Sequence, residues 1–194
     1  ISRIQSRDTG KSLTETRALA ASAAGTFRYF GAVAETMDEA LTARRGTALT
    51  MSVHEPLGVV GAITPWNSPI ASDAQKLAPA LAAGNAVILK PASWSPLTAL
   101  ELARIVEAAG LPPGLLSVLP GSGREIGSLL VEHPDIAKVS FTGGTETGRA
   151  LARKAAEKLM PVSLELGGKS PTIVFADADM EVALAGVLFG IFSS

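Results

Sequence analysis

The second half of the chain alternates between short aliphatic runs and longer segments of helix-forming composition. The aliphatic runs predict strands at residues 86–89, 115–119, 137–141 and 161–166. The segments between them predict helices at residues 97–109, 124–131 and 146–158. Aliphatic strands that alternate with helices form parallel sheets that are covered on both faces. The alternation therefore predicts an α/β fold with an open, parallel, doubly wound (Rossmann-like) sheet.

The remaining segments have simpler signatures. Residues 12–45 are rich in Ala, Glu, Arg and Leu and predict one or two long helices. Pro56 divides two β-rich runs, at residues 47–55 and 57–63, which predict extended strands that project or pair at an edge. Near the C-terminus we expect a further strand at residues 172–175 and an apolar helix at residues 183–192.

Composition excludes several classes of function. The chain has 194 residues, is 47% hydrophobic and carries a formal net charge of −1, so it can bury a core and has no bias toward nucleic acid or membrane surfaces. No apolar run approaches the ~20 residues of a membrane span, and the first residues lack a signal-peptide layout, so we expect a cytoplasmic protein. With no cysteine and two histidines, neither a disulfide nor a metal site is predicted.

Polar residues and glycines follow several of the predicted strands. In an open α/β sheet, ligands bind beyond the carboxyl ends of the strands. Asn67 follows the run that ends at residue 63, and Pro65 and Pro69 stiffen its loop so that it can aim the amide. The alternative is that Asn67 only caps the turn before the helix that Ser68 and Pro69 begin.

Lys90 ends the apolar run of residues 86–89, where its ammonium could meet a phosphate or a ribose hydroxyl. The alternative is a solvated strand end. Ser93 lies in the short loop that follows and is placed to contact a ligand along the same edge.

Glycine-rich turns follow two strands. In residues 142–149, Gly143, Gly144 and Gly148 would let backbone N–H groups approach an anion at a helix N-terminus. The second turn, at residues 121–127, contains Gly123 and misses the G-x-G-x-x-G spacing by one residue. A tight strand-to-helix turn without a ligand remains the alternative for both.

Glu165 stands in the apolar run at residues 161–166, just before Gly167 and Gly168. It shares one strand face with Ser163, while the alternating aliphatic residues take the other face. Because a buried unpaired carboxylate is costly, Glu165 either accepts hydrogen bonds from the glycine turn or is kept for chemistry.

Four of these segments, in this order, resemble the motifs of the aldehyde dehydrogenase superfamily. They are Thr64-Pro65-Trp66-Asn67, Lys90-Pro91-Ala92-Ser93, Phe-Thr-Gly-Gly-Thr-Glu-Thr-Gly at residues 141–148, and Leu-Glu-Leu-Gly-Gly-Lys-Ser-Pro at residues 164–171. Each motif alone is modest, but four in register are specific, and the resemblance runs the whole length of the chain.

In that superfamily a cysteine thiolate attacks an aldehyde, hydride passes to a nicotinamide, and the thioester is hydrolysed. The resemblance implies that Asn67 stabilises the oxyanion, a contribution of roughly 3 kcal/mol. It also implies that Glu165 is the general base that activates water, and that Lys76 assists proton movement. The nucleophilic cysteine is absent from the chain and is expected within about ten residues after Ser194.

The resemblance further implies a bound NAD or NADP. The implied cofactor-binding residues are Thr64, Pro65, Trp66, Asn67, Lys90, Ser93, Gly123, Phe141, Thr142, Gly143, Gly144, Gly148, Glu165, Leu166 and Gly167. Two of them depart from the common pattern. Gly144 replaces a phosphate-binding serine, and Ser93 replaces a glutamate that grips the adenosine ribose, which predicts that NADP is tolerated or used.

These implications set the expected domain organisation. Residues 1–45 would be N-terminal helices, residues 46–58 part of an oligomerisation hairpin and residues 59–194 the dinucleotide-binding domain, with a catalytic domain beyond. The expected partners are a small-molecule aldehyde and further copies of the chain, in a homodimer or homotetramer. The alternatives are a catalytically inactive nucleotide-binding scaffold or fragment, and a CoA-acylating relative that has no need of a water-activating base.

Overall fold

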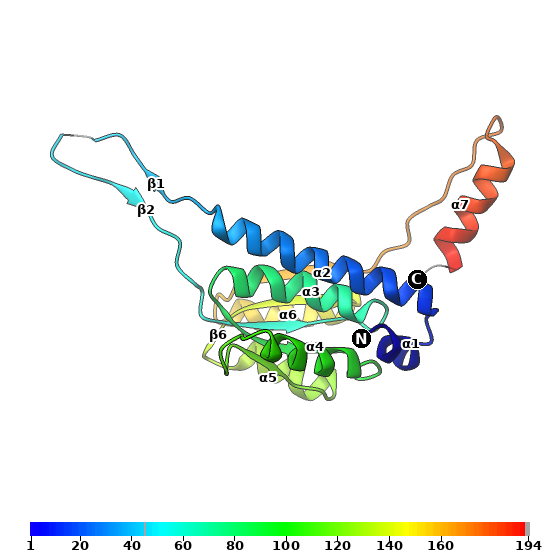
Figure 1. The fold of residues 1–194 in the computed structure, drawn as a ribbon. Coiled ribbons are helices and arrows are strands. Elements are labelled where there is room, and N and C mark those ends of the chain that lie inside the picture. The colour runs from blue at the N-terminus through cyan, green and yellow to red at the C-terminus, as the bar shows by residue number, and fades with distance from the viewer. Residues whose placement is uncertain (45, 193–194) are drawn as a thin grey trace.

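A computed structural model describes residues 1–44 and 46–192, and its centre is a five-stranded sheet (Figure 1). The strands are β3 (Val59–Ile63), β4 (Ala86–Lys90), β5 (Leu116–Val118), β6 (Ile136–Gly143) and β7 (Val162–Leu166). All neighbouring strands are parallel, and their order is β5-β4-β3-β6-β7. The first strand of the sheet, β3, is therefore central, as in doubly wound folds, so the prediction that residues 57–63 project or pair at an edge is wrong. The predicted fold class is confirmed.

Helices cover both faces of this sheet. The helices of the chain are α1 (Ser2–Thr9), α2 (Leu13–Glu35), α3 (Pro69–Ala82), α4 (Leu97–Ala108), α5 (Ser128–Glu132), α6 (Thr145–Glu157) and α7 (Met180–Phe192), of which α7 projects away from the sheet. A short π-helical turn, η1 (Gly123–Gly127), runs directly into α5. In Figure 1 the long α2 lies along the outer side of α3.

The two faces have separate hydrophobic cores. One core joins α2, α3 and α4 to β3 and β4 through residues such as Ala23, Leu77 and Leu89. The other joins α5 and α6 to β6 and β7 and includes Val139 and Leu151. Each core uses alternate residues of the strands, so the sheet is buried from both sides.

Several predicted elements differ from the structure. The helical segment predicted over residues 12–45 ends at Glu35, and α1 lies within the region of N-terminal helices expected over residues 1–45. A short antiparallel hairpin follows α2 and pairs β1 (Ala40–Leu41) with β2 (Met51–Ser52), so one of its strands lies inside the predicted helical range. Helical composition continues past Glu35, but the cross-strand hydrogen bonds of Thr42 to Thr50 favour the hairpin.

Two further predictions are wrong. Residues 172–175 form no strand, because no neighbouring strand among the described residues offers a backbone ladder, and Ile173 and Phe175 are exposed. The helix predicted over residues 124–131 is broken into η1 and α5. Ser122 caps the π turn by accepting a hydrogen bond from the Glu125 N–H at 3.2 Å.

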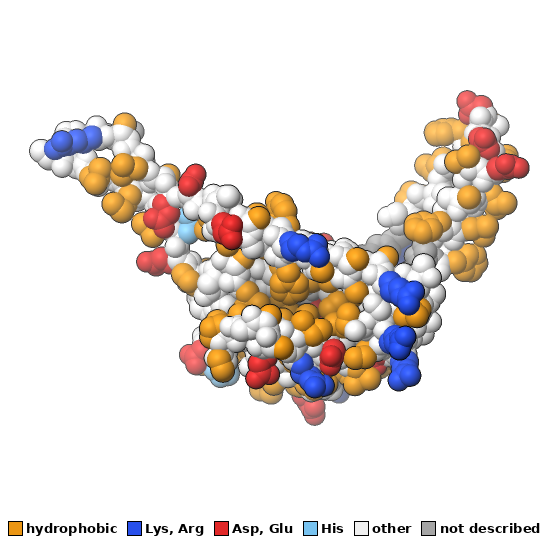
Figure 2. Space-filling view, in the orientation of Figure 1, with side chains coloured by type: hydrophobic (Ala, Val, Ile, Leu, Met, Phe, Trp, Pro, Cys, Tyr) orange, Lys and Arg blue, Asp and Glu red, His pale blue; other side chains and the backbone are white. Residues whose placement is uncertain are grey.

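Two segments project from the body of the molecule: the β1–β2 hairpin and α7 (Figure 1). Apolar side chains are prominent on both in the space-filling view (Figure 2). Leu41 and Met51 in the hairpin are exposed, as are Leu184 and Phe189 in α7. No helix in the described part of the chain is long and apolar enough to cross a membrane.

The turn between α3 and β4 provides a test of the fold. Gly84 has φ +78°, and a Cβ there would lie 2.9 Å from Cγ of Pro56. We expect Gly84→Ala to lower the free energy of unfolding by roughly 1 kcal/mol or more, because both the left-handed backbone and the contact oppose a side chain. Denaturant titration of the purified protein measures the change.

Gly25, inside α2, is the matched control. A Cβ on Gly25 would meet nothing within 4 Å, and alanine is the better helix former. Gly25→Ala should therefore raise the free energy of unfolding by about 0.5–1 kcal/mol. A destabilisation by both substitutions would show that the glycine in the turn is not special.

Candidate active site

The strand register brings the predicted site residues to one edge of the sheet. Ile63, the last residue of β3, pairs with Lys90 of β4 on one side and with Phe141 of β6 on the other. Thr142 then pairs with Glu165 of β7. The segments that follow β3, β4, β6 and β7 therefore start at neighbouring points of the carboxyl edge, as the sequence predicted.

The loop after β3 holds Asn67 at this edge. The Thr64 N–H donates to the Lys90 carbonyl at 3.1 Å, and the Ser95 hydroxyl donates to the Trp66 carbonyl at 3.5 Å. Trp66 and Asn67 are exposed, and the Asn67 side chain makes no hydrogen bond with the described residues. The amide is therefore held by its backbone and left open, and it does not cap the turn.

The start of α3 is capped from another helix. Ser68 and Pro69 stand where the sequence predicts, but the Ser68 hydroxyl makes no capping hydrogen bond. Instead, the Gln5 side-chain oxygen on α1 accepts from the Ile70 N–H at 3.4 Å. Gln5 was not predicted as a site residue, because a contact across 65 residues leaves no local signal in the sequence.

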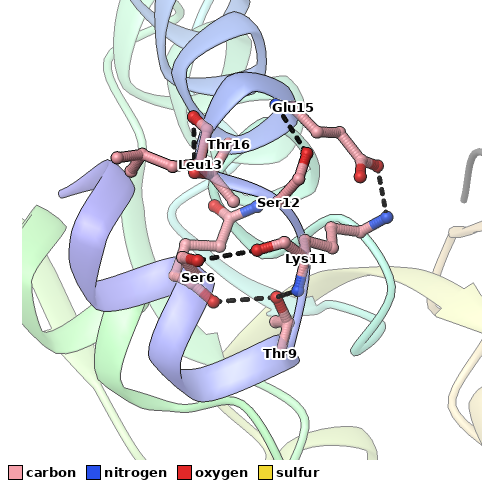
Figure 3. Close-up of polar contacts among 8 residues, drawn as sticks. Ser6, Thr9, Lys11, Ser12, Leu13, Glu15 and Thr16 are labelled. Carbon is pink, nitrogen blue, oxygen red and sulfur yellow. Dashed lines mark hydrogen bonds and ion pairs between the residues drawn. The ribbon is translucent and has the colours of Figure 1, made fainter.

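The α1–α2 connection, whose polar contacts are drawn in Figure 3, lines a groove together with Asn67. The Ser6 hydroxyl donates to the Lys11 carbonyl at 2.7 Å, and the Lys11 ammonium pairs with Glu15 at 2.5 Å. The groove has a volume of about 410 Å³, and Phe192 at the end of α7 also lines it. The Asn67 amide therefore faces a polar hollow that α7 reaches.

Glu165 and Lys76 lie on the α3 side of the sheet. Glu165 is exposed, so the expectation of a buried carboxylate is wrong, and it accepts no hydrogen bond from the glycine turn among the described residues. The Lys76 ammonium donates to the Ser140 hydroxyl at 2.9 Å. Burial lowers the pKa of Lys76, while the nearby Glu165 carboxylate opposes that shift. Ser140, which positions the lysine, was missed because a strand serine gives no sequence signal.

Lys90 is buried, so the alternative that it is a solvated strand end is wrong. Its side chain is almost inaccessible, its ammonium donates to the Pro91 carbonyl at 2.7 Å, and burial lowers its pKa. Ser93 is exposed and donates to the Gly121 carbonyl at 2.7 Å. That bond brings the loop after β4 against the turn that contains Gly123.

Gly143 at the end of β6, and Gly144 and Gly148 after it, have two different roles. Gly144 is the N-cap residue of α6, no side chain caps this helix, and a Cβ on Gly144 would meet nothing within 4 Å. The first N–H groups of α6 thus face open space, which suits an anion. A Cβ on Gly143 would lie 2.6 Å from the Phe141 ring, and one on Gly148 would lie 2.5 Å from Leu166.

The Gly148 contact brings α6 close to β7. This packing accounts for the glycine without a ligand, so its place in the cofactor path stays a prediction. Pro65 is half-buried beside the exposed Trp66, and Gly167 is exposed with open space around it. The edge therefore combines an open amide, a carboxylate near an ammonium, and uncapped backbone N–H groups.

Comparison with known proteins shows the family of this chain. The whole chain, residues 1–194, matches the sequence profile of the aldehyde dehydrogenase family. The chain belongs to the aldehyde dehydrogenase family. It is 46% identical to peroxisomal aminoaldehyde dehydrogenase 2 from pea (Pisum sativum) over 99% of its own length and 39% of that enzyme.

Solved aldehyde dehydrogenase structures agree. Betaine aldehyde dehydrogenase from Staphylococcus aureus, in complex with NAD+ and with a BME-free cysteine, superposes with a TM-score of 0.93 at 38% identity, covering 97% of this chain and 38% of that one. An NADP-dependent enzyme from Escherichia coli gives a TM-score of 0.92 at 39% identity, covering 98% and 40%. The chain thus spans about two fifths of the length of these relatives.

One buried acid near this edge of the sheet was not predicted. Asp73 on α3 is fully buried, and neither of its side-chain oxygens makes a standard hydrogen bond with the described residues. Burial raises the pKa of Asp73 to about 7, and the Thr64 hydroxyl partly opposes this effect. The apolar periodicity of α3 hid it, because a single acid in a core stripe looks like an exposed residue in sequence.

The raised pKa of Asp73 predicts a pH dependence of stability. The folded state holds the proton up to about pH 7, whereas the unfolded chain releases it near 3.8, so folding binds a proton between these values. The stabilisation is complete below pH 4 and is lost as pH rises through 7. Relative to Asp73→Asn, the wild type should lose a few kcal/mol over this range, at roughly 1.4 kcal/mol per pH unit.

Unfolding by denaturant at pH 4, 5, 6, 7 and 8 measures this difference. Asp135→Asn is the control, because Asp135 is an exposed aspartate at the opposite end of β6. A constant difference in stability between the wild type and Asp73→Asn across these pH values would contradict the prediction.

Proposed function

We propose that the protein containing this chain oxidises an aldehyde to a carboxylic acid with NAD+ or NADP+. The observation that carries the proposal is the open Asn67 amide at the same sheet edge as the unpaired Glu165 carboxylate. A scaffold that only bound nucleotide would need neither group. A CoA-acylating enzyme would need no base for water, so Glu165 favours the hydrolytic reaction.

Asn67 supplies electrostatic stabilisation. Its side-chain NH2 donates to the carbonyl oxygen as negative charge develops there during attack on the aldehyde. Because the loop is held at Thr64 and Trp66, the amide needs little reorganisation at the moment of reaction. One such donor contributes roughly 3 kcal/mol.

Glu165 removes a proton from the water that hydrolyses the thioester. It is free for this role because it is exposed and makes no hydrogen bond with the described residues. Ser140 holds the Lys76 ammonium on the same side of the sheet. We propose that Lys76 assists the proton movement around this carboxylate.

The nucleophile is proposed to be a cysteine that follows this stretch, since the 194 residues contain none. Phe192, at the end of α7, lines the groove beside Asn67. Asn67 would then stabilise the oxygen of the same carbonyl that the thiolate attacks. The exposed apolar side chains of α7 fit a helix that packs against a further domain.

The residues at the edge fit a dinucleotide. The uncapped N-terminus of α6 offers backbone N–H groups to a phosphate, and Gly144 leaves the space in front of it open. Thr64 to Asn67, Lys90 and Ser93 would hold the rest of the cofactor along the strand ends. When bound, the nicotinamide supplies the hydride acceptor. We also propose that the protein forms a homodimer or homotetramer through the β1–β2 hairpin. Its proposed location is the cytoplasm.

Single substitutions in the full-length protein test the two catalytic roles. Asn67→Ala should lower kcat about 10²- to 10³-fold, because it removes a donor to the oxyanion. Glu165→Gln should leave one fast turnover of reduced cofactor followed by a slow steady state, because acyl-enzyme accumulates. Stopped-flow absorbance of the reduced nicotinamide measures both.

Asp135→Asn, at the opposite end of β6, is a control for expression and assembly. An unchanged steady-state rate in the Glu165→Gln variant would contradict the proposed general-base role of Glu165. Complete inactivity of the wild type toward a panel of aldehydes would remove the proposed function itself.

Cofactor choice gives a separate prediction. Ser93 carries no charge that would repel a 2′-phosphate, so kcat/KM with NADP+ should lie within about tenfold of the value with NAD+. Ser93→Glu should shift the ratio toward NAD+ by roughly tenfold or more, because the carboxylate binds ribose hydroxyls and repels phosphate. A strong preference of the wild type for NAD+ would contradict the assignment.

A further inference from the structure

Asp73 occupies a core position of α3. The buried residues of this helix include Ile70, Asp73, Ala74 and Leu77, which form one stripe at helical spacing. An apolar residue would be the less costly choice in this stripe, because a carboxyl without partners loses its hydration. The acid therefore lowers stability at a position that is one helical turn from Lys76 and about one turn from Pro69, where the loop with Asn67 enters α3.

Thr64 carries the hydroxyl that Asp73 can hydrogen-bond. Thr64 is 4% exposed, and its hydroxyl, like both Asp73 oxygens, lacks a standard hydrogen bond in the described part of the chain. The hydroxyl nevertheless lies near enough to Asp73 to influence its protonation. A protonated carboxyl can donate one hydrogen bond and accept others, so it can satisfy the threonine.

We propose that Asp73 is a positioning residue, whose carboxyl hydrogen-bonds the Thr64 hydroxyl and so ties α3 to the loop that carries Asn67. Thr64 begins that loop, and its N–H is already bonded to Lys90. The Asp73 link closes the segment from residue 64 to residue 73, with Asn67 inside it. The catalytic consequence rests on the proposed function of Asn67, whereas the effect on the loop does not.

Gln5 gives the same region a second anchor. Its side-chain oxygen accepts from the Ile70 N–H, while its amide nitrogen is buried without a standard partner. Side chains from α1 and α3 and the start of the loop thus place buried polar atoms around the first turns of α3. Buried polar groups are normally satisfied, so such a concentration indicates a constraint that the fold retains at a cost in stability.

Asp73→Leu and Asp73→Asn in the full-length protein test this role. Leucine removes the buried carboxyl and should keep or raise Tm, whereas asparagine keeps a neutral hydrogen-bonding group. Asp73→Leu should speed amide hydrogen exchange at residues 66–68 several-fold. It should also lower kcat and kcat/KM together by roughly 10- to 100-fold, because a misplaced Asn67 weakens only the transition state. Asp73→Asn should stay within about threefold of wild type.

Thr64→Val provides an independent arm, read by exchange alone because Thr64 also lies in the predicted cofactor path. It should speed exchange at residues 66–68 as Asp73→Leu does, and the double variant should add nothing further. Asp135→Leu, at the opposite end of β6, is the matched acid-to-leucine control and should change neither kcat nor exchange in this loop.

The outcomes separate the two hypotheses. If wild-type protein oxidises aldehydes and Asp73→Leu keeps wild-type kcat and exchange, the positioning role is overturned while the function stands. If the wild type is inactive, the proposed function fails, and the exchange rates alone decide whether Asp73 holds the loop. A loss of kcat with no change in exchange would also overturn the role as stated.

Discussion

The parallel pairing of β3 with β4 on one side and β6 on the other is the constraint from which the site follows. Because these three strands run in the same direction in a fixed register, Ile63, Lys90 and Phe141 end side by side. Each following segment then leaves the sheet at the same edge. An amide from one loop, a lysine from the next strand and a glycine turn from a third meet there, although the sequence separates them by dozens of residues.

This convergence leaves a set of polar groups in a poorly hydrated place. Lys90 is almost fully buried, Lys76 is half-buried, and Asp73 is completely buried. Lys90 and Lys76 each find an oxygen acceptor, from Pro91 and Ser140. Asp73 finds no standard partner in the described part of the chain, and burial raises its pKa. A chain selected for stability alone would place apolar residues in such positions, so their presence ties this edge to function.

The two projecting segments, the β1–β2 hairpin and α7, expose apolar surface (Figure 2). The hairpin exposes Leu41 and Met51, and α7 exposes apolar residues along its whole length. A helix that is apolar on every side is normally buried. Phe192, at the end of α7, lies in the groove beside Asn67.

The sequence by itself determined the α/β class, the positions of the five sheet strands and the edge at which the site lies. Strand and helix periodicity, together with the segments that follow strands, carry that information locally. The sequence predicted three site residues from their places relative to recognisable strands: Asn67 and Lys90 follow such a run, and Glu165 lies near the end of one.

Only the tertiary structure decided which residues lie close together in space although they are distant in the chain. It put Ser140 against Lys76, Gln5 at the start of α3 and Thr64 beside Asp73. It also ended α2 at Glu35 and left residues 172–175 without a strand, because a hairpin or a ladder forms only where a partner lies. Propensity describes one segment at a time, whereas burial and hydrogen bonding depend on which segments meet.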